Sequence, residues 1–107
     1  MNLSARVGSI SDNRLGGWYS YRMSKSALNQ ATRTLSIELK RQGTRVHALH
    51  PGTCETGLSQ PFQRNVKPEK LFSKEYAVSM MLDVVDHHMT MENTGAFLAY
   101  DGSTIEY

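Results

Sequence analysis

The stretch GWYSYRMSKSALNQATRTLSIELKRQ, residues 17–42, carries the clearest structural signal in the sequence. Lys25, Leu28, Thr32, Leu35 and Leu39 recur at intervals of three and four residues, which is the spacing of one helix face. Two basic residues stand in the last turn and Gly43 follows, an order that commonly ends a helix. The pattern predicts a helix over residues 19–42. Its inward stripe is predicted to contain Lys25, Leu28, Ala31, Thr32, Leu35 and Leu39, and its opposite face Asn29, Arg33 and Lys40.

Shorter segments on both sides of this helix predict strands. Residues 45–50 (RVHALH) and 95–100 (GAFLAY) each end at a turn signal, and residues 1–7 have room for the end of a third strand. Residues 57–70, with two prolines, predict a loop. The alternation of helix and strand predicts the fold class α/β with parallel strands. A second helix, capped by Ser73, is predicted to turn inward Ala77, Met80, Met81, Val84 and His88.

The composition excludes several classes of protein. The chain has 107 residues, 39% hydrophobic and 21% charged, with a net charge of +2, which is unlike an intrinsically disordered chain. It lacks the run of about 18 apolar residues that a membrane span needs, and its weak, scattered charge does not suit a nucleic-acid surface. Cys54 is the single cysteine, so we expect a reducing compartment. With no apolar leader visible, the expected location is cytoplasmic, without a membrane or nucleic-acid partner.

Tyr21 and Lys25 are the strongest candidates for chemistry. They stand four residues apart at the start of the predicted helix, so their side chains share one face. A free phenol has a pKa of about 10, and a nearby opposite charge lowers the pKa of such a group by about 1–3 units. Tyr21 would then suit general acid–base catalysis. An isolated Y-x-x-x-K pattern is common by chance, and a buried tyrosine beside a surface lysine is the alternative.

The residues around this pair resemble a known family. Residues 21–28 (YRMSKSAL) match the pattern Y-x-x-S-K-[AS]-A-[LV], and residues 50–56 (HPGTCET) are similar to a P-G-x-x-x-T segment. These two motifs, their order and the interval between them resemble the short-chain dehydrogenase/reductase family. Residues 4–10 (SARVGSI), 16–22 (GGWYSYR) and 95–102 (GAFLAYDG) are similar to its branch of C-factor-like and sniffer-type carbonyl reductases. The resemblance covers essentially the whole chain.

The resemblance implies a fold and a reaction. The fold would be the C-terminal part of a Rossmann-like doubly wound parallel sheet. The reaction would be carbonyl reduction or alcohol oxidation of a small molecule with NAD or NADP, NADP being favoured, and without a metal. Tyr21 would exchange a proton with the substrate, and Lys25 would lower its pKa and hold the nicotinamide ribose. The implied cofactor-binding residues are Tyr21, Lys25, Pro51, Gly52, Thr53, Cys54 and Thr56.

The resemblance also implies a possible homodimer. In this family the helix that carries the tyrosine usually joins its copy, which corresponds to helix 19–42 here. The outer face of that helix would be built from Asn29, Arg33, Ile37 and their neighbours. A solvated face of a monomer would have the same composition, so both alternatives stay open.

Two departures from the family pattern affect the predicted site. The family's catalytic serine opens an S-x-x-G motif, but Ala5 stands three residues before Gly8, with Ser4 and Ser9 nearby. Ser9 is the candidate to polarise a carbonyl, or else its hydroxyl serves the loop backbone. The glycines form no G-x-x-x-G-x-G turn for a pyrophosphate. We therefore expect residues 1–107 to be the C-terminal half of such a domain, inactive in isolation; the alternative is an inactive truncated product that serves as a dimerisation or interaction module.

The histidines and the cysteine offer little support for a metal site. His47 and His50 are predicted on opposite faces of one strand, and no further ligand pair has zinc-binding spacing. We expect no metal. Cys54 has no lysine beside it, so we expect a passive, partly buried thiol.

Overall fold

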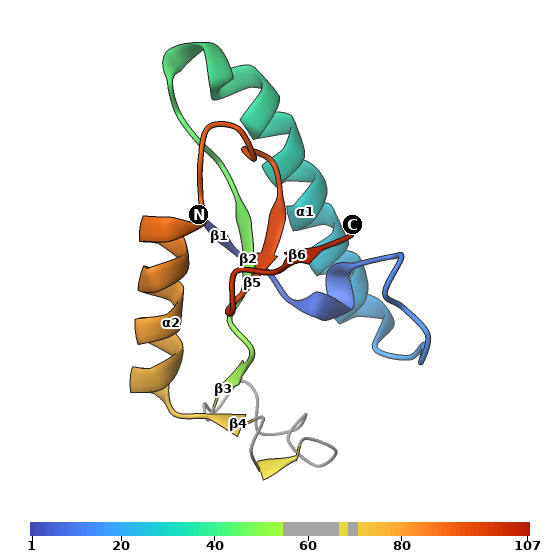
Figure 1. The fold of residues 1–107 in the computed structure, drawn as a ribbon. Coiled ribbons are helices and arrows are strands. Elements are labelled where there is room, and N and C mark those ends of the chain that lie inside the picture. Colours follow the sequence, from blue (N-terminus) through green and yellow to red (C-terminus); the bar gives the residue numbers. More distant parts are fainter. Residues whose placement is uncertain (55–66, 69–70) are drawn as a thin grey trace.

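Two helices flank a small sheet (Figure 1). The computed structural model describes residues 1–54, 67–68 and 71–107. α1 lies on one side of the central strands and α2 on the other. In chain order the described elements are β1 (Asn2–Leu3), the 3-10 helix η1 (Arg6–Gly8), α1 (Tyr19–Leu39), the 3-10 turn η2 (Lys40–Gln42), β2 (Ala48–His50), β3 (Thr53–Cys54), β4 (Leu71–Phe72), α2 (Lys74–His87), β5 (Phe97–Ala99) and β6 (Thr104–Ile105).

The main sheet has the strand order β1-β2-β5-β6. β1 is parallel to β2, with Leu3 opposite Leu49, and β2 is parallel to β5, with Leu49 opposite Leu98. The chain crosses from β1 to β2 through α1 and from β2 to β5 through α2, because parallel neighbours need such crossovers. β6 is antiparallel to β5. The predicted α/β class with parallel strands, including a strand within residues 1–7, is confirmed.

Alternate residues of the central strands supply two hydrophobic clusters. Successive side chains of a strand point to opposite faces of the sheet. Leu49 and Leu98 therefore pack with Val84 and Met89, at the face that α2 covers. The second cluster consists of Ala48, Phe97, Ala99 and Ile105.

The buried stripe of α1 differs from the predicted one. Its fully buried residues are Asn29, Thr32 and Ser36, whereas Leu35 is 40% exposed. The Asn29 carboxamide donates to the Gly8 carbonyl and accepts a hydrogen bond from the Ser4 hydroxyl at 2.6 Å. The prediction that Asn29 faces outward is wrong, because α1 packs against backbone groups that need polar partners. Asn29 is thus also no part of an outer dimer face.

The remaining boundaries follow the predictions closely. The last predicted turn of the first helix is η2, and Gly43 ends it at φ +75°. Ser73 is confirmed as an N-cap, since its side chain accepts the Tyr76 N–H. Ala77 and Val84 are buried as predicted, but His88 is exposed because α2 ends just before it. The predicted loop 57–70 lies almost wholly outside the described residues. No helix in the described part of the chain is long and apolar enough to cross a membrane.

Candidate functional site

A cleft of about 630 Å³ opens beyond the carboxyl ends of β1 and β2. This is the edge at which open α/β sheets bind their ligands. Its walls come from the turn after β1, the loop before α1 with the first turns of that helix, residues 50–54 after β2, and the first half of α2. Segments that are far apart in the sequence therefore meet around one space. The cleft contains most of the residues that the sequence singled out.

Tyr21 and Lys25 both line this cleft from the first turns of α1. The Lys25 ammonium nitrogen donates to the Leu3 carbonyl at 3.2 Å and lies 5.8 Å from the centre of the Tyr21 ring. Burial raises the pKa of Tyr21. The predicted lowering of this pKa is not found in the described chain, where the ammonium is directed to the end of β1. A phenol with a raised pKa stays protonated at neutral pH and remains a proton donor.

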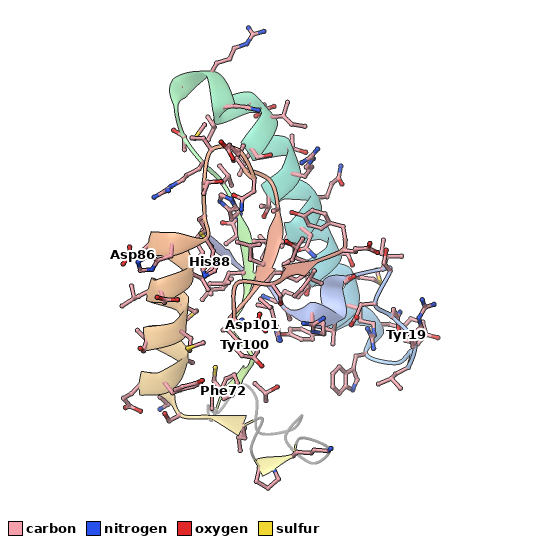
Figure 2. The ribbon with its side chains drawn as sticks, viewed as in Figure 1. Tyr19, Phe72, Asp86, His88, Tyr100 and Asp101 are labelled. Atoms are coloured by element: carbon pink, nitrogen blue, oxygen red, sulfur yellow. The ribbon has the colours of Figure 1, made fainter. Side chains whose placement is uncertain are left out.

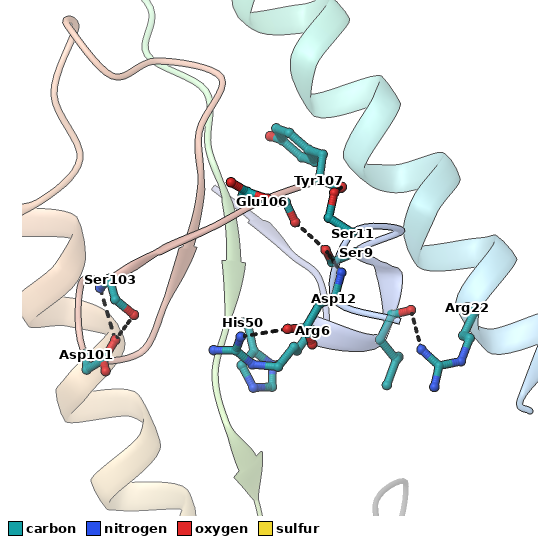
Figure 3. A network of polar contacts seen from close by, with 11 residues as sticks. Arg6, Ser9, Ser11, Asp12, Arg22, His50, Asp101, Ser103, Glu106 and Tyr107 are labelled. Carbon is teal, nitrogen blue, oxygen red and sulfur yellow. Dashed lines mark hydrogen bonds and ion pairs between the residues drawn. The ribbon is translucent and has the colours of Figure 1, made fainter. Parts of the chain in front are cut away.

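The structure does not bring Ser9 to the cleft. Ser9 is 1% exposed, and its hydroxyl donates to the Glu106 carbonyl and accepts the Asp12 N–H at 3.1 Å (Figure 3). These contacts correspond to the alternative that Ser9 serves the backbone. Ser4 and Ala5 do line the cleft, but the Ser4 hydroxyl is engaged with Asn29.

Residues 51–54 form a second wall of the cleft. Gly52 has φ +80°, and a Cβ placed there would overlap the Phe72 ring, so only glycine fits. The Phe72 ring makes an edge contact with the Tyr100 ring, with 4.7 Å between their centres (Figure 2). Burial raises the pKa of the Cys54 thiol, which agrees with a passive cysteine. Thr56 lies outside the described residues.

His47 directly precedes β2 and His50 ends it, and the two rings have different surroundings. The His47 ring is buried and bonds the Asn93 carboxamide at 2.7 Å. His50 lines the cleft, and its Nδ1 accepts the Arg6 N–H at 3.3 Å. Across residues 1–54, 67–68 and 71–107, no group of three histidine, cysteine or acidic side chains is placed to hold a metal ion. Sequence reasoning missed His50 as a cleft residue, although its position directly before Pro51-Gly52 at a strand end was a usable signal.

Among the charged side chains that line the cleft, most are cationic. The described lining carries one carboxylate, that of Asp12. Such a cleft favours an anionic ligand, because side chains of one charge in a low-dielectric cleft focus the electric field. The cationic side chains are Arg6, Arg14, Arg22, Lys25 and Lys74.

Comparisons with known proteins agree with this arrangement. The family profile described as enoyl-(acyl carrier protein) reductase matches residues 6–105. The chain is 35% identical to C-signal of Myxococcus xanthus over 106 residues, which is 99% of this chain and 59% of that protein. Its structure is similar to the carbonyl reductase Sniffer of D. melanogaster, with a TM-score of 0.84 and 30% identity over 98% of this chain and 39% of that one.

A second solved structure is similar over the same range. It is an NADPH-bound carbonyl reductase from chicken fatty liver, with a TM-score of 0.83 and 31% identity, covering 98% of this chain and 41% of that one. The chain thus spans about three fifths of C-signal and about two fifths of these two structures. The residues matched by the family profile include all the described cleft residues except Leu3, Ser4 and Ala5.

Proposed function

The chain belongs to the short-chain dehydrogenase/reductase family of oxidoreductases, and from that premise we propose that it supplies the proton-donating and nicotinamide-side half of a carbonyl reductase. The observation that carries this proposal is the shared cleft: Tyr21 and Lys25 line it from α1, and residues 51–54 line it after β2. The substrate class is a small carbonyl compound or the corresponding alcohol.

The donors of the cleft fit the nicotinamide end of a dinucleotide. An ammonium group and a phenol suit the ribose hydroxyls, while the backbone around Thr53 and Cys54 suits a carboxamide. The close fit of Gly52 against Phe72 holds that backbone in place. We assign Tyr21, Lys25 and residues 51–54 to cofactor binding, and Thr56 by its motif alone. NADP is the favoured cofactor, because the similar carbonyl reductase from chicken fatty liver is NADPH-bound.

The proposed reaction needs a hydride and a proton. The reduced nicotinamide, when bound, supplies the hydride to the carbonyl carbon. Tyr21 donates its hydroxyl proton to the carbonyl oxygen, so the carbonyl becomes an alcohol and Tyr21 becomes a phenolate. Lys25 stabilises that phenolate by its positive charge, and a proton from solvent restores the phenol. In alcohol oxidation the same residues act in the opposite order.

We test the proposal with Tyr21→Phe in the protein that the complete gene encodes. The variant should lose at least about 100-fold in kcat for carbonyl reduction, since general acid catalysis is worth about 10²–10⁴, while its Kd for NADP changes little. Tyr19→Phe is the matched control: Tyr19 stands two residues earlier in α1 and is 81% exposed (Figure 2), so its loss should leave kcat unchanged. Equal kcat in Tyr21→Phe and the unaltered protein would refute the role. No reduction by the unaltered protein of a panel of aldehydes and ketones would refute the function and favour an interaction module instead.

A further inference from the structure

His50 ends β2 and faces the cleft that also holds Tyr21 and Lys25. Its ring makes an edge contact with the Tyr100 ring, with 6.4 Å between the ring centres. Its backbone position is fixed by the parallel pairing of His50 with Ala99. The imidazole is thus a rigidly placed polar group at the site. The reduction proposed above, which uses Tyr21 and Lys25, gives it no role.

The hydrogen bond of Nδ1 determines the tautomer of the ring. Nδ1 accepts the Arg6 backbone N–H at 3.3 Å (Figure 3), so it carries no proton. A neutral imidazole has one protonated nitrogen, which must then be Nε2. Nε2–H is consequently a hydrogen-bond donor.

Nε2 also remains available to a ligand. It makes no hydrogen bond within the described part of the chain. In that part, each side-chain nitrogen or oxygen that is itself buried, on a residue that is not exposed, has a hydrogen-bond partner. Nε2 must therefore be accessible to solvent, on a side chain that lines the cleft.

Burial keeps the ring neutral. Burial, and to a smaller extent the Arg6 guanidinium, lower the pKa of His50 to about 4, although the Asp101 and Asp12 carboxylates oppose this in part. At neutral pH the ring is therefore an uncharged donor with a fixed tautomer. Such a group polarises a carbonyl without competing with Tyr21 to deliver the proton.

We propose that His50 is a catalytic residue whose Nε2–H donates a hydrogen bond to the substrate carbonyl oxygen while Tyr21 transfers its proton there. The proposal rests on the proposed carbonyl reduction. It gives the cleft a second donor to the reacting oxygen, at a site where Ser9 is turned away and the Ser4 hydroxyl is engaged with Asn29. His50 forms no covalent bond to the substrate and gains or loses no proton.

The two nitrogens can be tested separately. In His50→Asn the carboxamide oxygen can replace Nδ1 as the acceptor of the Arg6 N–H, but the Nε2 donor is lost. In His50→Gln the longer side chain places an amide N–H near the position of Nε2. We expect His50→Asn to lose about 100-fold in kcat, as when one preorganised donor to the developing oxyanion is removed, and His50→Gln to stay within about 10-fold of the unaltered protein. KM should change little in both variants.

The outcomes separate this inference from the function it rests on. If Tyr21→Phe abolishes turnover but His50→Asn does not, or if His50→Gln is as impaired as His50→Asn, the donor role of His50 is overturned and the reductase stands. If the unaltered protein reduces no carbonyl compound, both fail.

A spectroscopic measurement tests the tautomer without catalysis. In a long-range ¹⁵N–¹H correlation spectrum of the complete protein at pH 7, His50 should show a protonated Nε2 and an unprotonated Nδ1. A protonated Nδ1, or a doubly protonated ring, would overturn the proposal even if both variants failed to fold.

Discussion

At the scale of the residue, the cleft depends on a glycine whose backbone conformation and surroundings both exclude a side chain. Gly52 lies in the left-handed region at φ +80°, and any Cβ there would run into the Phe72 ring, which Tyr76 and Tyr100 hold by edge contacts. Gly43 has almost the same φ, +75°, but no atom lies near its missing Cβ. Both positions require a left-handed backbone, but only Gly52 lacks room for a Cβ.

Alanine at these two glycines should therefore have unequal effects. Gly43→Ala should lower the free energy of unfolding by about 1–2 kcal/mol, the cost of a left-handed backbone for a residue with a Cβ. Gly52→Ala should cost about 1–3 kcal/mol more, because the new methyl group forces the ring to shift. Urea denaturation of both variants measures the difference in the free energy of unfolding. Equal destabilisation would contradict the close packing of Phe72 on Gly52.

At the scale of the element, α1 packs against η1 and the segment before it through polar side chains and a close approach of the two backbones. A Cβ on Gly8 would lie 2.7 Å from the Lys25 Cβ, which shows how closely η1 packs on the helix. At that separation large apolar side chains do not fit, and the Asn29 carboxamide bridges Ser4 and Gly8 instead. The contact positions Lys25 at the cleft.

Removing the Asn29 carboxamide should destabilise the chain, because the Ser4 hydroxyl is left without a hydrogen-bond acceptor. Asn29→Ala should cost about 1–3 kcal/mol, because the buried Ser4 hydroxyl loses its acceptor. Gln30→Ala, at an exposed position next to it, should change the free energy of unfolding by no more than about 0.5 kcal/mol. Adding Ser4→Ala to Asn29→Ala should recover part of the loss, and purely additive losses in this double-mutant cycle would disprove the coupling.

At the scale of the whole molecule, two histidines make stability depend on pH: His47, directly before β2, and His50, at the end of β2. Burial lowers the pKa of both His47 and His50, that of His50 to about 4. The unfolded chain, with histidine pKa values near 6.5, then binds more protons than the folded chain at mildly acidic pH. The stabilisation is present above about pH 6.5 and is lost as pH falls through the folded pKa values.

The free energy of unfolding should accordingly decrease between about pH 6.5 and pH 4. His50 alone accounts for a decrease of about 3 kcal/mol, because its pKa is about 6.5 in the unfolded chain and about 4 in the folded chain. In His50→Gln the free energy of unfolding should decrease by about 3 kcal/mol less over this pH range. The contribution of His47 should remain. Denaturation curves recorded at half-unit pH intervals measure it, and an unchanged slope in His50→Gln would show that this ring is not buried neutral.

Local sequence was sufficient for the elements and for the pairing of Tyr21 with Lys25, because helix period, caps and turn residues act within a few positions. Ser73, Gly43 and the alternation of helix with strand all led to the correct elements. β3, β4 and β6 are two residues long, too short to show any alternation, so only their pairing partners define them.

Other features depend on contacts between segments far apart in the chain. Asn29 turned out to be buried because its partners, Ser4 and Gly8, come from another element. Ser9 donates to the carbonyl of Glu106, 97 residues away. The closeness of Tyr21 and Lys25 in the sequence predicted a lowered pKa for Tyr21, but burial raises it. Hydrogen-bond satisfaction and desolvation depend on what packs around a group, and those neighbours exist only once the chain has folded.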